Sequence, residues 1–313
     1  MMRKCNQCGH SSSRHFFDSC DRFYGVGGRF ELYKCRDCGL VFVHPQPSDA
    51  ELVKYYPKNY YSYSPAAPNA GLKNKIIRYI KDPFRIFYIA LYVKIFHFDR
   101  GLHAVSGGRI LDVGCGSGDF LVKFRQRGMN CFGVETDSAA VEKAKARGLK
   151  VSLGALESAE FEDDYFDIIV VHHVLEHTRD PRATLGEIKR ILKPSGTLVV
   201  AVPNTESLCF WIFRSYWSQL DVPRHLYSFS KSTLSSYLRA VGFKIKKVNC
   251  NSTPFQFLGS LVCLCDRLWY RRLLLKDAGA FVENSILWFL LSPLVIICNL
   301  LKIGDSIDIK ATK

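Results

Sequence analysis

Two pairs of cysteines near the amino terminus have the spacing of metal ligands. Cys5-Asn-Gln-Cys8-Gly and Cys35-Arg-Asp-Cys38-Gly repeat one knuckle, in which a glycine follows the second cysteine. That glycine permits a left-handed turn that points backbone amides at a thiolate. Four thiolates with this spacing make a closed tetrahedral zinc site, which stabilises a segment too small to have a core of its own. We therefore predict a structural zinc ribbon over residues 1–48; free core thiols and a redox pair are the alternatives.

A glycine-rich loop follows an apolar run in the middle of the chain. Residues 111–120 read LDVGCGSGDF, so that glycines alternate at positions 114, 116 and 118. Glycines let the backbone turn tightly and approach a ligand, and a helix after the loop would point its amides at that ligand. A dinucleotide-binding loop requires Gly-x-Gly-x-x-Gly, but Asp119 occupies its third glycine position. Asp112 and Asp119 flank the turn, which favours a ligand with a positive centre over a pyrophosphate.

The glycine-rich loop and three later motifs resemble the class I methyltransferases that depend on S-adenosylmethionine (SAM). In chain order the matching runs are LDVGCGSGDF, GVETD (133–137), DDYFDIIVVHHVLEHTRDP (163–181) and LKPSGTLVVAVPN (192–204). The resemblance covers about residues 105–250. It implies that the loop cradles the methionine part of SAM, whose ammonium and sulfonium groups are cationic. It also implies that Glu135 binds the two ribose hydroxyls, for which a carboxylate at a strand end is chemically suited.

One stretch departs from the family pattern. Many relatives carry Gly-Asp-Ala after the third strand, where the aspartate contacts the adenine amino group, whereas this chain has Leu153-Gly-Ala-Leu156. Backbone groups and apolar packing would then hold the adenine. The implied cofactor-binding residues are Asp112, Gly114, Cys115, Gly116, Gly118, Glu135, Ala155, Leu156 and His173. A glycine turn in a Rossmann-like domain without a cofactor is the alternative.

Two histidine-containing segments offer a general base for methyl transfer. Transfer from a sulfonium is an in-line displacement, so alignment contributes much of the acceleration. A hydroxyl acceptor must also lose a proton, and histidine suits that role near neutral pH. The run from His172 to His177 follows the fourth strand, at the edge of the sheet where ligands bind. The run from Asp221 to Phe229 contains His225, and the family resemblance implies that a histidine there faces the acceptor.

We expect His225 to be the catalytic base, with His177 supporting it or substituting for it. The alternatives are structural. His177 could cap a turn, His173 could pack or hydrogen-bond locally, and His225 could anchor its loop through a backbone carbonyl. A His225→Ala variant distinguishes these roles, because loss of a base lowers turnover while SAM affinity is retained.

A doubly wound α/β domain is needed to bring these residues together. From Arg109 onward, short apolar runs alternate with helical periods, which is typical of βαβ units and a parallel sheet. Strands are predicted at Arg109–Val113, Cys131–Glu135, Val151–Leu153, Asp167–His172, Thr197–Val202, Phe243–Asn249 and Ser306–Thr312. Helices are predicted at Asp119–Gly128, Ser138–Gly148, Arg182–Leu192 and Lys231–Val241. The sequence thus predicts a seven-stranded, Rossmann-like SAM-dependent methyltransferase domain over residues 105–313.

An uncharged run near the carboxy terminus is too short and too interrupted for a membrane span. Residues 285–301 are seventeen residues without a charge, interrupted by Pro293 and Asn299, whereas a span needs about 20 apolar residues. A spanning helix would also put the sixth and seventh strands, which we expect to pair antiparallel, on opposite sides of a bilayer. We therefore predict an apolar helical insertion over residues 255–301, and an aromatic, basic helical linker over residues 49–104.

The composition excludes several classes of protein. The chain has 313 residues, 48% of them hydrophobic and 23% charged, which suits about two folded domains. It is therefore not a disordered tail, a collagen-like fibre or a polytopic membrane protein. Its 43 Lys and Arg against 29 Asp and Glu give 43 − 29 = +14, which indicates an anionic partner such as nucleic acid, a membrane surface or a phosphorylated substrate.

The basic residues indicate which anionic partner to expect. Many lie among apolar residues at 72–98 and 267–276, which favours peripheral membrane association through 72–98 and 255–301 over nucleic acid. Packing of these segments on each other, a roof over the active site or a dimer contact are the alternatives. The amino terminus has no apolar core or cleavage site of a secretory signal. We therefore expect the chain in the reducing cytoplasm, or at the inner face of the membrane.

These features together predict an enzyme that transfers a methyl group from SAM to a hydroxyl of a sugar, glycan or quinone-like acceptor, small or lipid-linked. The ribbon and the methyltransferase motifs together also resemble a bacterial group linked to methylation of sugars, polyketide-like and isoprenoid-quinone substrates, in which the ribbon helps to cover the acceptor. The alternatives are a sugar C-methyltransferase, a ribbon-led nucleic-acid-binding or RNA-modifying protein, and a SAM-binding sensor without activity.

Overall fold

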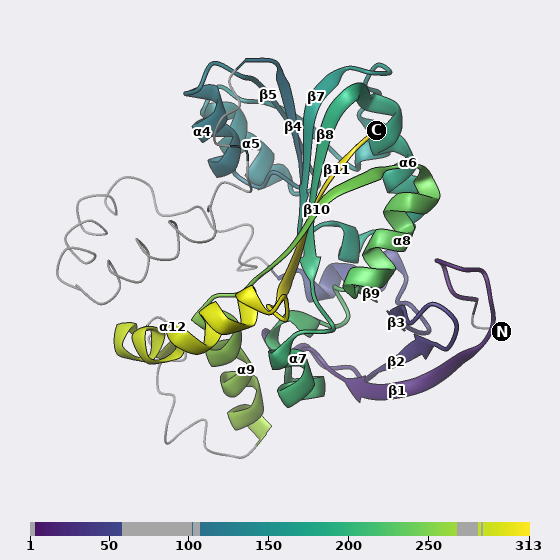
Figure 1. The fold of residues 1–313 in the computed structure, drawn as a ribbon, viewed down its shortest axis with the longest axis vertical. Coiled ribbons are helices and arrows are strands. Elements are labelled where there is room, and N and C mark those ends of the chain that lie inside the picture. Colours follow the sequence, from purple (N-terminus) through teal and green to yellow (C-terminus); the bar gives the residue numbers. More distant parts are fainter. Residues whose placement is uncertain (1–3, 58–101, 103–106, 268–280, 283) are drawn as a thin grey trace.

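The computed structural model describes residues 4–57, 102, 107–267, 281–282 and 284–313 (Figure 1). Two sheets organise them: a seven-stranded sheet in the carboxy-terminal part, and a four-stranded sheet that begins near the amino terminus. The helical stretch predicted at 72–98 lies outside the described residues.

The seven-stranded sheet has the order β10-β11-β8-β7-β4-β5-β6. Its strands are β4 (Arg109–Val113), β5 (Asn130–Glu135), β6 (Lys150–Leu153), β7 (Phe166–His172), β8 (Leu192–Pro203), β10 (Lys244–Asn251) and β11 (Ser306–Thr312). The strands from β8 to β6 run parallel, and β11 is antiparallel to its neighbours β8 and β10. The predicted fold class is therefore confirmed, including a seventh strand that pairs antiparallel with the sixth.

Helices cover both faces of this sheet (Figure 1). On one face lie α4 (Asp119–Arg125) and α5 (Ser138–Ala146), and on the other α6 (Pro181–Ile191) and α8 (Lys231–Val241). The central strand β7 alternates between the two cores: Ile168 and Val170 belong to the cluster under α4 and α5, whereas Ile169 and Val171 belong to the cluster under α6 and α8. A side-chain period of two produces this pattern, and burial on both faces explains why the strand is apolar throughout.

Element boundaries differ by a few residues from those that the sequence predicts. β8 begins at Leu192 instead of Thr197, because Leu192 pairs with Phe166 of β7 across an irregularity in the register. The preceding helix α6 therefore ends at Ile191, and Leu192 already has extended backbone angles (φ −81°, ψ 133°). Pairing with a distant strand, and not local propensity, decides where this helix ends.

The four-stranded sheet joins two distant parts of the chain. Its strands, in spatial order, are β1 (Ser13–Ser19), β2 (Phe30–Cys35), β3 (Val41–Val43) and β9 (Tyr227–Ser228). β9 belongs to the segment after β8, and it pairs antiparallel with β3 through Phe42 and Tyr227. Cys35, Leu40 and Phe42 also lie in the same buried cluster as Leu226 and Tyr227. The amino-terminal ribbon therefore packs continuously with the core of the larger sheet.

Short helical segments complete the fold. After β3 come α1 (Asp49–Leu52) and η1 (Val53–Tyr55); after β6 and β7 come η2 (Leu156–Ser158) and η3 (Leu175–His177); after β8 come α7 (Leu208–Phe213), η4 (Arg214–Tyr216) and η5 (Ser218–Leu220). The predicted insertion between the sixth and seventh strands is confirmed by α9 (Pro254–Arg267) and α12 (Ser285–Leu300); residues 268–280, in its middle, lie outside the described part. Of the helices in the described ranges, none is long and apolar enough to cross a membrane.

Candidate active site and metal centre

The glycine-rich loop between β4 and α4 packs tightly against the chain that leaves β7. Gly114, Gly116 and Gly118 have φ angles of 70°, 51° and 79°, in the left-handed region that favours glycine. A Cβ atom at Gly114 would lie only 2.4 Å from Cγ2 of Val174. The loop therefore needs glycine at position 114 both for its conformation and for its closeness to the end of β7.

Glu135 ends β5 and reaches across to this loop. Its Oε2 accepts a hydrogen bond from the Gly116 amide (2.9 Å), and its Oε1 accepts from the amides of Thr136 (2.7 Å) and Asp137 (3.0 Å). These bonds fix the carboxylate at the carboxyl ends of two adjacent parallel strands, where ligands bind in open α/β sheets. A carboxylate at this place has the acceptor capacity for two vicinal hydroxyls.

The remaining cofactor residues predicted from the sequence lie at the same edge of the sheet. Asp112 is buried on β4, and Leu156 is buried just beyond β6, next to Ala155. Cys115 is buried against Gly133, where a Cβ atom would lie 2.5 Å from the cysteine Sγ. Burial raises the pKa of the Cys115 thiol well above its usual value, and nearby carboxylates add to the effect. Cys115 is therefore a neutral packing residue at this edge of the sheet. We call the edge formed by the carboxyl ends of β4, β5 and β6 the cofactor edge.

His173, which is partly exposed, pairs with the buried Glu176 directly after β7. His173 has a left-handed backbone (φ 56°), a conformation that non-glycine residues adopt disproportionately at functional sites. Its Nδ1 lies 3.0 Å from Oε1 of Glu176. Glu176 is 0% exposed, and within the described part of the chain its Oε2 has no hydrogen-bond partner. Val174, between His173 and Glu176 in the chain, packs against Gly114 of the glycine-rich loop. The segment that carries the Glu176 carboxylate therefore lies beside the cofactor edge.

The rings of His177 and His225 meet edge to face, with centroids 4.5 Å apart. Nδ1 of His225 lies 2.9 Å from the Gln219 carbonyl, and Nδ1 of His177 lies 3.1 Å from the Arg224 carbonyl. Because a carbonyl oxygen only accepts, each Nδ1 carries a proton and each neutral ring has its lone pair on Nε2. Nε2 of His225 lies 3.9 Å from Oε1 of Glu176. The structure thus brings together both histidines that the sequence singles out for catalysis.

Burial sets the charge state of this histidine cluster. It lowers the pKa of His225 well below 6.5, helped by His177 and partly opposed by Glu176. Burial lowers the pKa of His177 as well, against the pull of Glu176 and Asp221. Burial alone would raise the pKa of Glu176, but the hydrogen bond with His173 and the other imidazoles outweigh it and lower that pKa. At neutral pH two neutral imidazoles therefore lie beside a carboxylate, and a proton acceptor is available.

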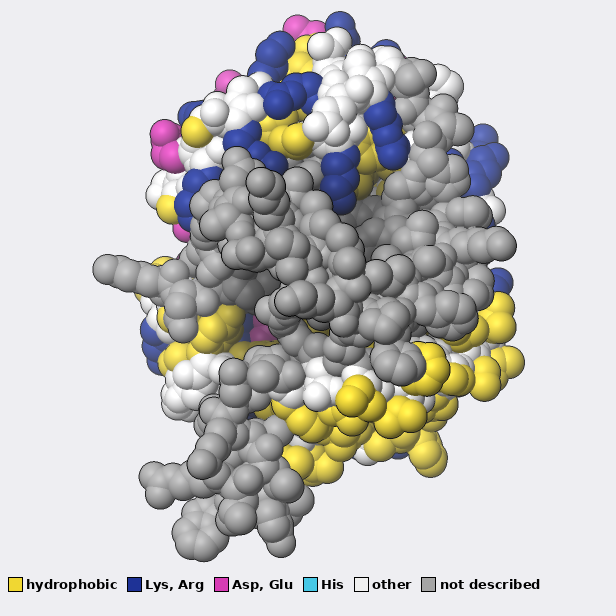
Figure 2. Space-filling model, turned by 90° about the vertical axis from the view of Figure 1, so that its left-hand side faces the viewer, with side chains coloured by type: hydrophobic (Ala, Val, Ile, Leu, Met, Phe, Trp, Pro, Cys, Tyr) yellow, Lys and Arg dark blue, Asp and Glu magenta, His cyan; other side chains and the backbone are white. Residues whose placement is uncertain are grey.

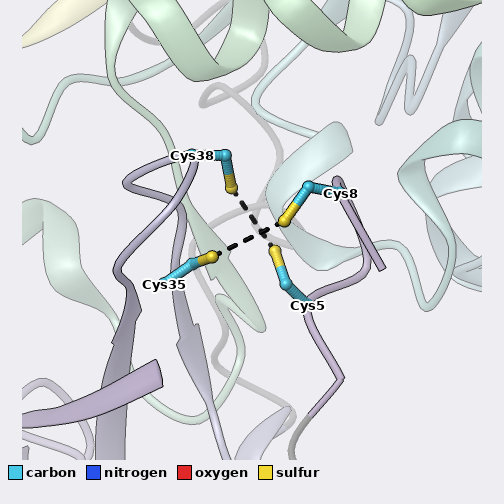
Figure 3. A group of neighbouring side chains, drawn as sticks. All are labelled: Cys5, Cys8, Cys35 and Cys38. Carbon is cyan, nitrogen blue, oxygen red and sulfur yellow. Dashed lines mark hydrogen bonds between the residues drawn. The ribbon is translucent and has the colours of Figure 1, made fainter. Parts of the chain in front are cut away.

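Four cysteine side chains converge on one point (Figure 3). The Sγ atoms of Cys5 and Cys38 are 3.4 Å apart, and those of Cys8 and Cys35 are 3.6 Å apart. These distances exclude disulfides, whose S–S bond is about 2.05 Å. They approach about 3.8 Å, the edge of a tetrahedron of sulfurs that lie about 2.3 Å from zinc. The hydrogen bond with Cys38 lowers the pKa of the Cys5 thiol to about 5, although burial opposes the shift. The four sulfurs fit a tetrahedral metal ion.

Comparison with known proteins decides the family. Residues 91–248, which are 158 of the 313 (248 − 91 + 1), match the family model described as a methyltransferase domain. The chain belongs to this methyltransferase family. A ubiquinone biosynthesis O-methyltransferase of Hahella chejuensis is 29% identical over 150 residues, which are 44% of this chain and 63% of that protein. This match spans less than two thirds of the relative's length.

Further relatives resemble the same methyltransferase domain. A ubiquinone biosynthesis O-methyltransferase of Rhodopseudomonas palustris is 27% identical over 216 residues, covering 65% of this chain and 83% of that protein. Among solved structures, a SAM-dependent methyltransferase from Archaeoglobus fulgidus shares 21% identity over 76% of this chain and 99% of its own, with a TM-score of 0.46.

The methyltransferase site also contains three charged residues whose roles the sequence did not reveal. Arg224 is fully buried, and its guanidinium donates hydrogen bonds to the carboxylates of Asp221 and Asp21. The Asp-x-x-Arg-His spacing of residues 221–225 is a local signal for the first of these pairs. Asp21 belongs to the ribbon, 203 residues from Arg224, and no pattern in the sequence connects the two.

Proposed function

We propose that this methyltransferase transfers a methyl group from SAM to a hydroxyl oxygen of a small-molecule or lipid-linked acceptor. The observation that carries the proposal is the neutral His177–His225 pair, held beside Glu176 next to the cofactor edge. When bound, SAM supplies the methyl group as an electrophilic carbon and leaves as S-adenosylhomocysteine with the carbon–sulfur electron pair. Asp112, the glycine-rich loop and Glu135 are the residues that would hold it.

His225 is the residue that takes the acceptor's proton, at Nε2. The hydrogen bond from its Nδ1 to the Gln219 carbonyl fixes the ring and leaves the Nε2 lone pair free. Glu176, 3.9 Å from Nε2, stabilises the imidazolium that forms, and His177 supports the ring or substitutes for it. A positioned base of this kind typically contributes about 10²–10⁴ in rate.

A quinone-like acceptor is the leading choice among the sugars, glycans and quinone-like molecules that the sequence suggests. Relatives named ubiquinone biosynthesis O-methyltransferases support O-methylation of such a ring. The base also favours it: because burial lowers the pKa of His225, it removes a proton more readily from a phenol, with a pKa near about 10, than from a less acidic sugar alcohol. C-methylation of a sugar is the second candidate.

Labelled SAM provides the test of the reaction. The full chain would be incubated with methyl-labelled SAM and, separately, a polyprenyl catechol, a nucleotide-linked sugar and bulk tRNA. We expect methylation of the catechol oxygen and stoichiometric S-adenosylhomocysteine. Label on a sugar carbon would favour the C-methyltransferase, and label on tRNA would favour an RNA-modifying protein. SAM binding without transfer to any of the three would overturn the enzymatic proposal in favour of a sensor.

We also propose that the methyltransferase binds a membrane surface peripherally, on the cytoplasmic side. The helix α12 supports this, because Ile286, Leu290 and Ile297, which share one face, are each more than half exposed, whereas Val295 and Cys298 are buried. Figure 2 shows exposed apolar side chains gathered in the lower part of the molecule, where Figure 1 places α7, α9 and α12. An apolar helix face of this kind suits the boundary between lipid headgroups and acyl chains.

Flotation with vesicles tests the membrane proposal. The folded chain should float with vesicles of phosphatidylcholine and phosphatidylglycerol, and the variant Leu290→Ser/Leu294→Ser/Ile297→Ser should not. Val53→Ser is the matched control, because Val53 is 71% exposed and lies on η1 instead of α12. Flotation of the triple variant, or none of the unaltered chain, contradicts the proposal; a dimer that the triple variant dissociates would show that α12 binds a second copy.

We further propose that Cys5, Cys8, Cys35 and Cys38 hold a structural zinc ion, and that the ribbon scaffolds or covers the acceptor side of the site. The convergence of the four sulfurs supports the metal. The pairing of β3 with β9 supports the second role, because β9 begins two residues after His225.

A further inference from the structure

The guanidinium of Arg224 is enclosed between the ribbon and the loop that carries the proposed base. Its Nη2 donates to Oδ1 of Asp21 (2.8 Å) and its Nη1 to the Tyr55 carbonyl (2.7 Å). Its Nε donates to both carboxylate oxygens of Asp221 (3.0 Å each). The side chains of Arg224 and Asp21 are both 0% exposed. One arginine therefore ties two segments of the amino-terminal region to the loop.

Asp221 is the link between this arginine and His225. Oδ2 of Asp221 lies 3.9 Å from Nε2 of His225, as far as Oε1 of Glu176 does. The Asp221 carbonyl also accepts the His225 amide hydrogen bond (3.0 Å), and Asp221 has a left-handed backbone (φ 38°). Two carboxylates thus face the nitrogen that would accept the proton, and Arg224 is paired with one of them.

We propose that Arg224 is a positioning residue that couples the ribbon to His225. Its guanidinium neutralises Asp221, so that Asp221 does not hold a proton on Nε2 of His225 and the lone pair stays available to the acceptor. Asp21 shares the guanidinium and anchors it to the ribbon. The inference rests on the proposed role of His225 as the base, but its central quantity, the pH at which His225 titrates, is measurable without an acceptor.

Several charged and titratable groups face His225. Glu176 favours its protonated form, whereas His177 and His173 oppose it. The Asp221 carboxylate lies as close to Nε2 of His225 as the Glu176 carboxylate does. Glu176 and both histidines belong to the segment after β7 and are unchanged in variants at positions 21, 221 and 224. Their influence therefore cancels when such variants are compared, and the remaining difference reports the triad of Asp21, Arg224 and Asp221.

A histidine titration by nuclear magnetic resonance tests the coupling. The Cε1–H resonance of His225, assigned by its loss in His225→Gln, is followed against pH in protein with labelled histidines. Arg224→Gln releases the Asp221 carboxylate, so the midpoint should rise by about one pH unit or more. Adding Asp221→Asn should cancel that rise. An unchanged midpoint in Arg224→Gln, or a rise that persists in the double variant, overturns the proposal, because disorder of the loop alone would move both variants alike.

A second set of variants keeps the test decisive if Arg224→Gln does not fold. That variant leaves two buried carboxylates without their cation, which is strongly destabilising. Asp21→Asn/Arg224→Gln removes one charge of each sign, and asparagine can still accept the amide hydrogen bonds that Oδ1 of Asp21 takes from Phe23 and Tyr24. In this double variant the titration midpoint of His225 should rise as in Arg224→Gln, and adding Asp221→Asn should cancel the rise. If either result fails, the coupling is wrong. Arg239→Gln, on the exposed face of α8, is the control and should shift nothing.

The pH profile of methyl transfer provides a second readout and separates the two proposals. The acidic limb of the profile should move to higher pH with the titration midpoint in Asp21→Asn/Arg224→Gln. If the chain transfers no methyl group, the proposed function fails while the titration still tests the coupling. If transfer occurs but neither midpoint nor limb moves, the function stands and the coupling is wrong.

Discussion

Phe42 of the ribbon and Tyr227 of the methyltransferase domain are paired across an antiparallel bridge, two residues beyond His225. Between this bridge and His225, the amide of Leu226 donates a hydrogen bond to the Glu176 carbonyl (2.8 Å). The backbone of this loop is therefore held by the edge strand of the ribbon on one side and by the segment of Glu176 on the other. We therefore expect the proposed zinc ion to influence a site that it does not touch.

Removal of the metal should weaken methyl transfer more than SAM binding. Cys8→Ser deletes one of the four sulfurs, so we expect the zinc content to fall from one per chain towards none, with a lower Tm. Without the pairing of β3 with β9, His225 should be misplaced, and methyl transfer should slow by about tenfold or more. The SAM Kd should change by less than about threefold, because the cofactor edge lies on β4 and β5. Metal analysis measures the zinc content, calorimetry the Tm and the SAM Kd, and the labelled-SAM assay the rate of transfer.

Cys20→Ser is the matched control for this experiment, because Cys20 lies outside the four-sulfur cluster. It should retain zinc, stability and transfer. Normal transfer in a Cys8→Ser protein without zinc would contradict the scaffolding role, whereas an equal loss of SAM binding and transfer would indicate that the whole chain had unfolded.

Two glycines separate the effect of backbone strain from that of close packing. Gly114 and Gly128 both have left-handed backbones, with φ of 70° and 78°. A Cβ atom at Gly114 meets Val174 at 2.4 Å, whereas at Gly128 it meets nothing within 4 Å. Alanine at either position costs about 1–2 kcal/mol of conformational strain, but only Gly114→Ala should displace the loop after β7 and weaken SAM binding about tenfold or more. Calorimetric titration with SAM measures this, and equal Kd values would contradict the packing argument.

Glu135→Ala should weaken SAM binding through the ribose. A hydrogen bond to a charged group contributes about 1.5–3 kcal/mol, and we expect two such bonds to be partly offset by the contacts that the carboxylate already makes with Gly116. The Kd for SAM should therefore rise about 10- to 100-fold. Glu142→Ala, on the exposed face of α5, is the control. A variant that binds SAM as tightly as the unaltered chain would exclude Glu135 from the ribose site.

The parts of this fold that the sequence predicts are those that local patterns specify. The strand Ser306–Thr312 is found as predicted, because alternating side chains mark it and its turn residues precede it. The places of the glycine-rich loop and of Glu135 are also predictable, since the loop follows β4 and Glu135 ends β5 within one continuous βαβ unit. In both cases the residues that decide the structure are close together in the chain.

The parts that the sequence does not predict depend on distant partners. β9 is two residues long and becomes a strand only because Phe42, 185 positions before Tyr227 (227 − 42), pairs with it. Arg224 would ordinarily be expected at the surface, because an isolated buried charge is costly. Its burial is compensated by the neighbouring Asp221 and by Asp21, which the ribbon brings from 203 residues away.

His225→Ala should lower kcat while leaving SAM affinity unchanged. Loss of a positioned base typically costs about 10²–10⁴ in rate, and the ring does not belong to the glycine-rich loop. His177→Ala should cost less, about tenfold, because that ring supports His225 edge to face. Single-turnover rates with labelled SAM measure both effects. Normal turnover in His225→Ala would assign the ring a structural role through its bond to the Gln219 carbonyl.

The same two histidines should make the fold less stable in mild acid. The folded-state pKa values of His177 and His225 are lowered from 6.5, so just below pH 6.5 the unfolded chain binds more protons than the folded one. The stability that they contribute is complete above about pH 6.5, and is lost as pH falls from there towards the folded values, by up to about 1.4 kcal/mol per pH unit for each histidine. The pKa of Glu176 is lowered from 4.5, so its contribution is lost only below that pH and does not affect a comparison made above pH 5.

Urea unfolding at pH 7.5 and pH 5.5 measures this dependence. The unaltered chain should be less stable at pH 5.5, and His177→Gln/His225→Gln should reduce the difference by about 1–3 kcal/mol. Arg239→Gln, on the exposed face of α8, is the control and should leave the difference unchanged. If the double variant keeps the full pH dependence, the two imidazoles do not cause it, and burial does not lower their pKa values as the structure indicates.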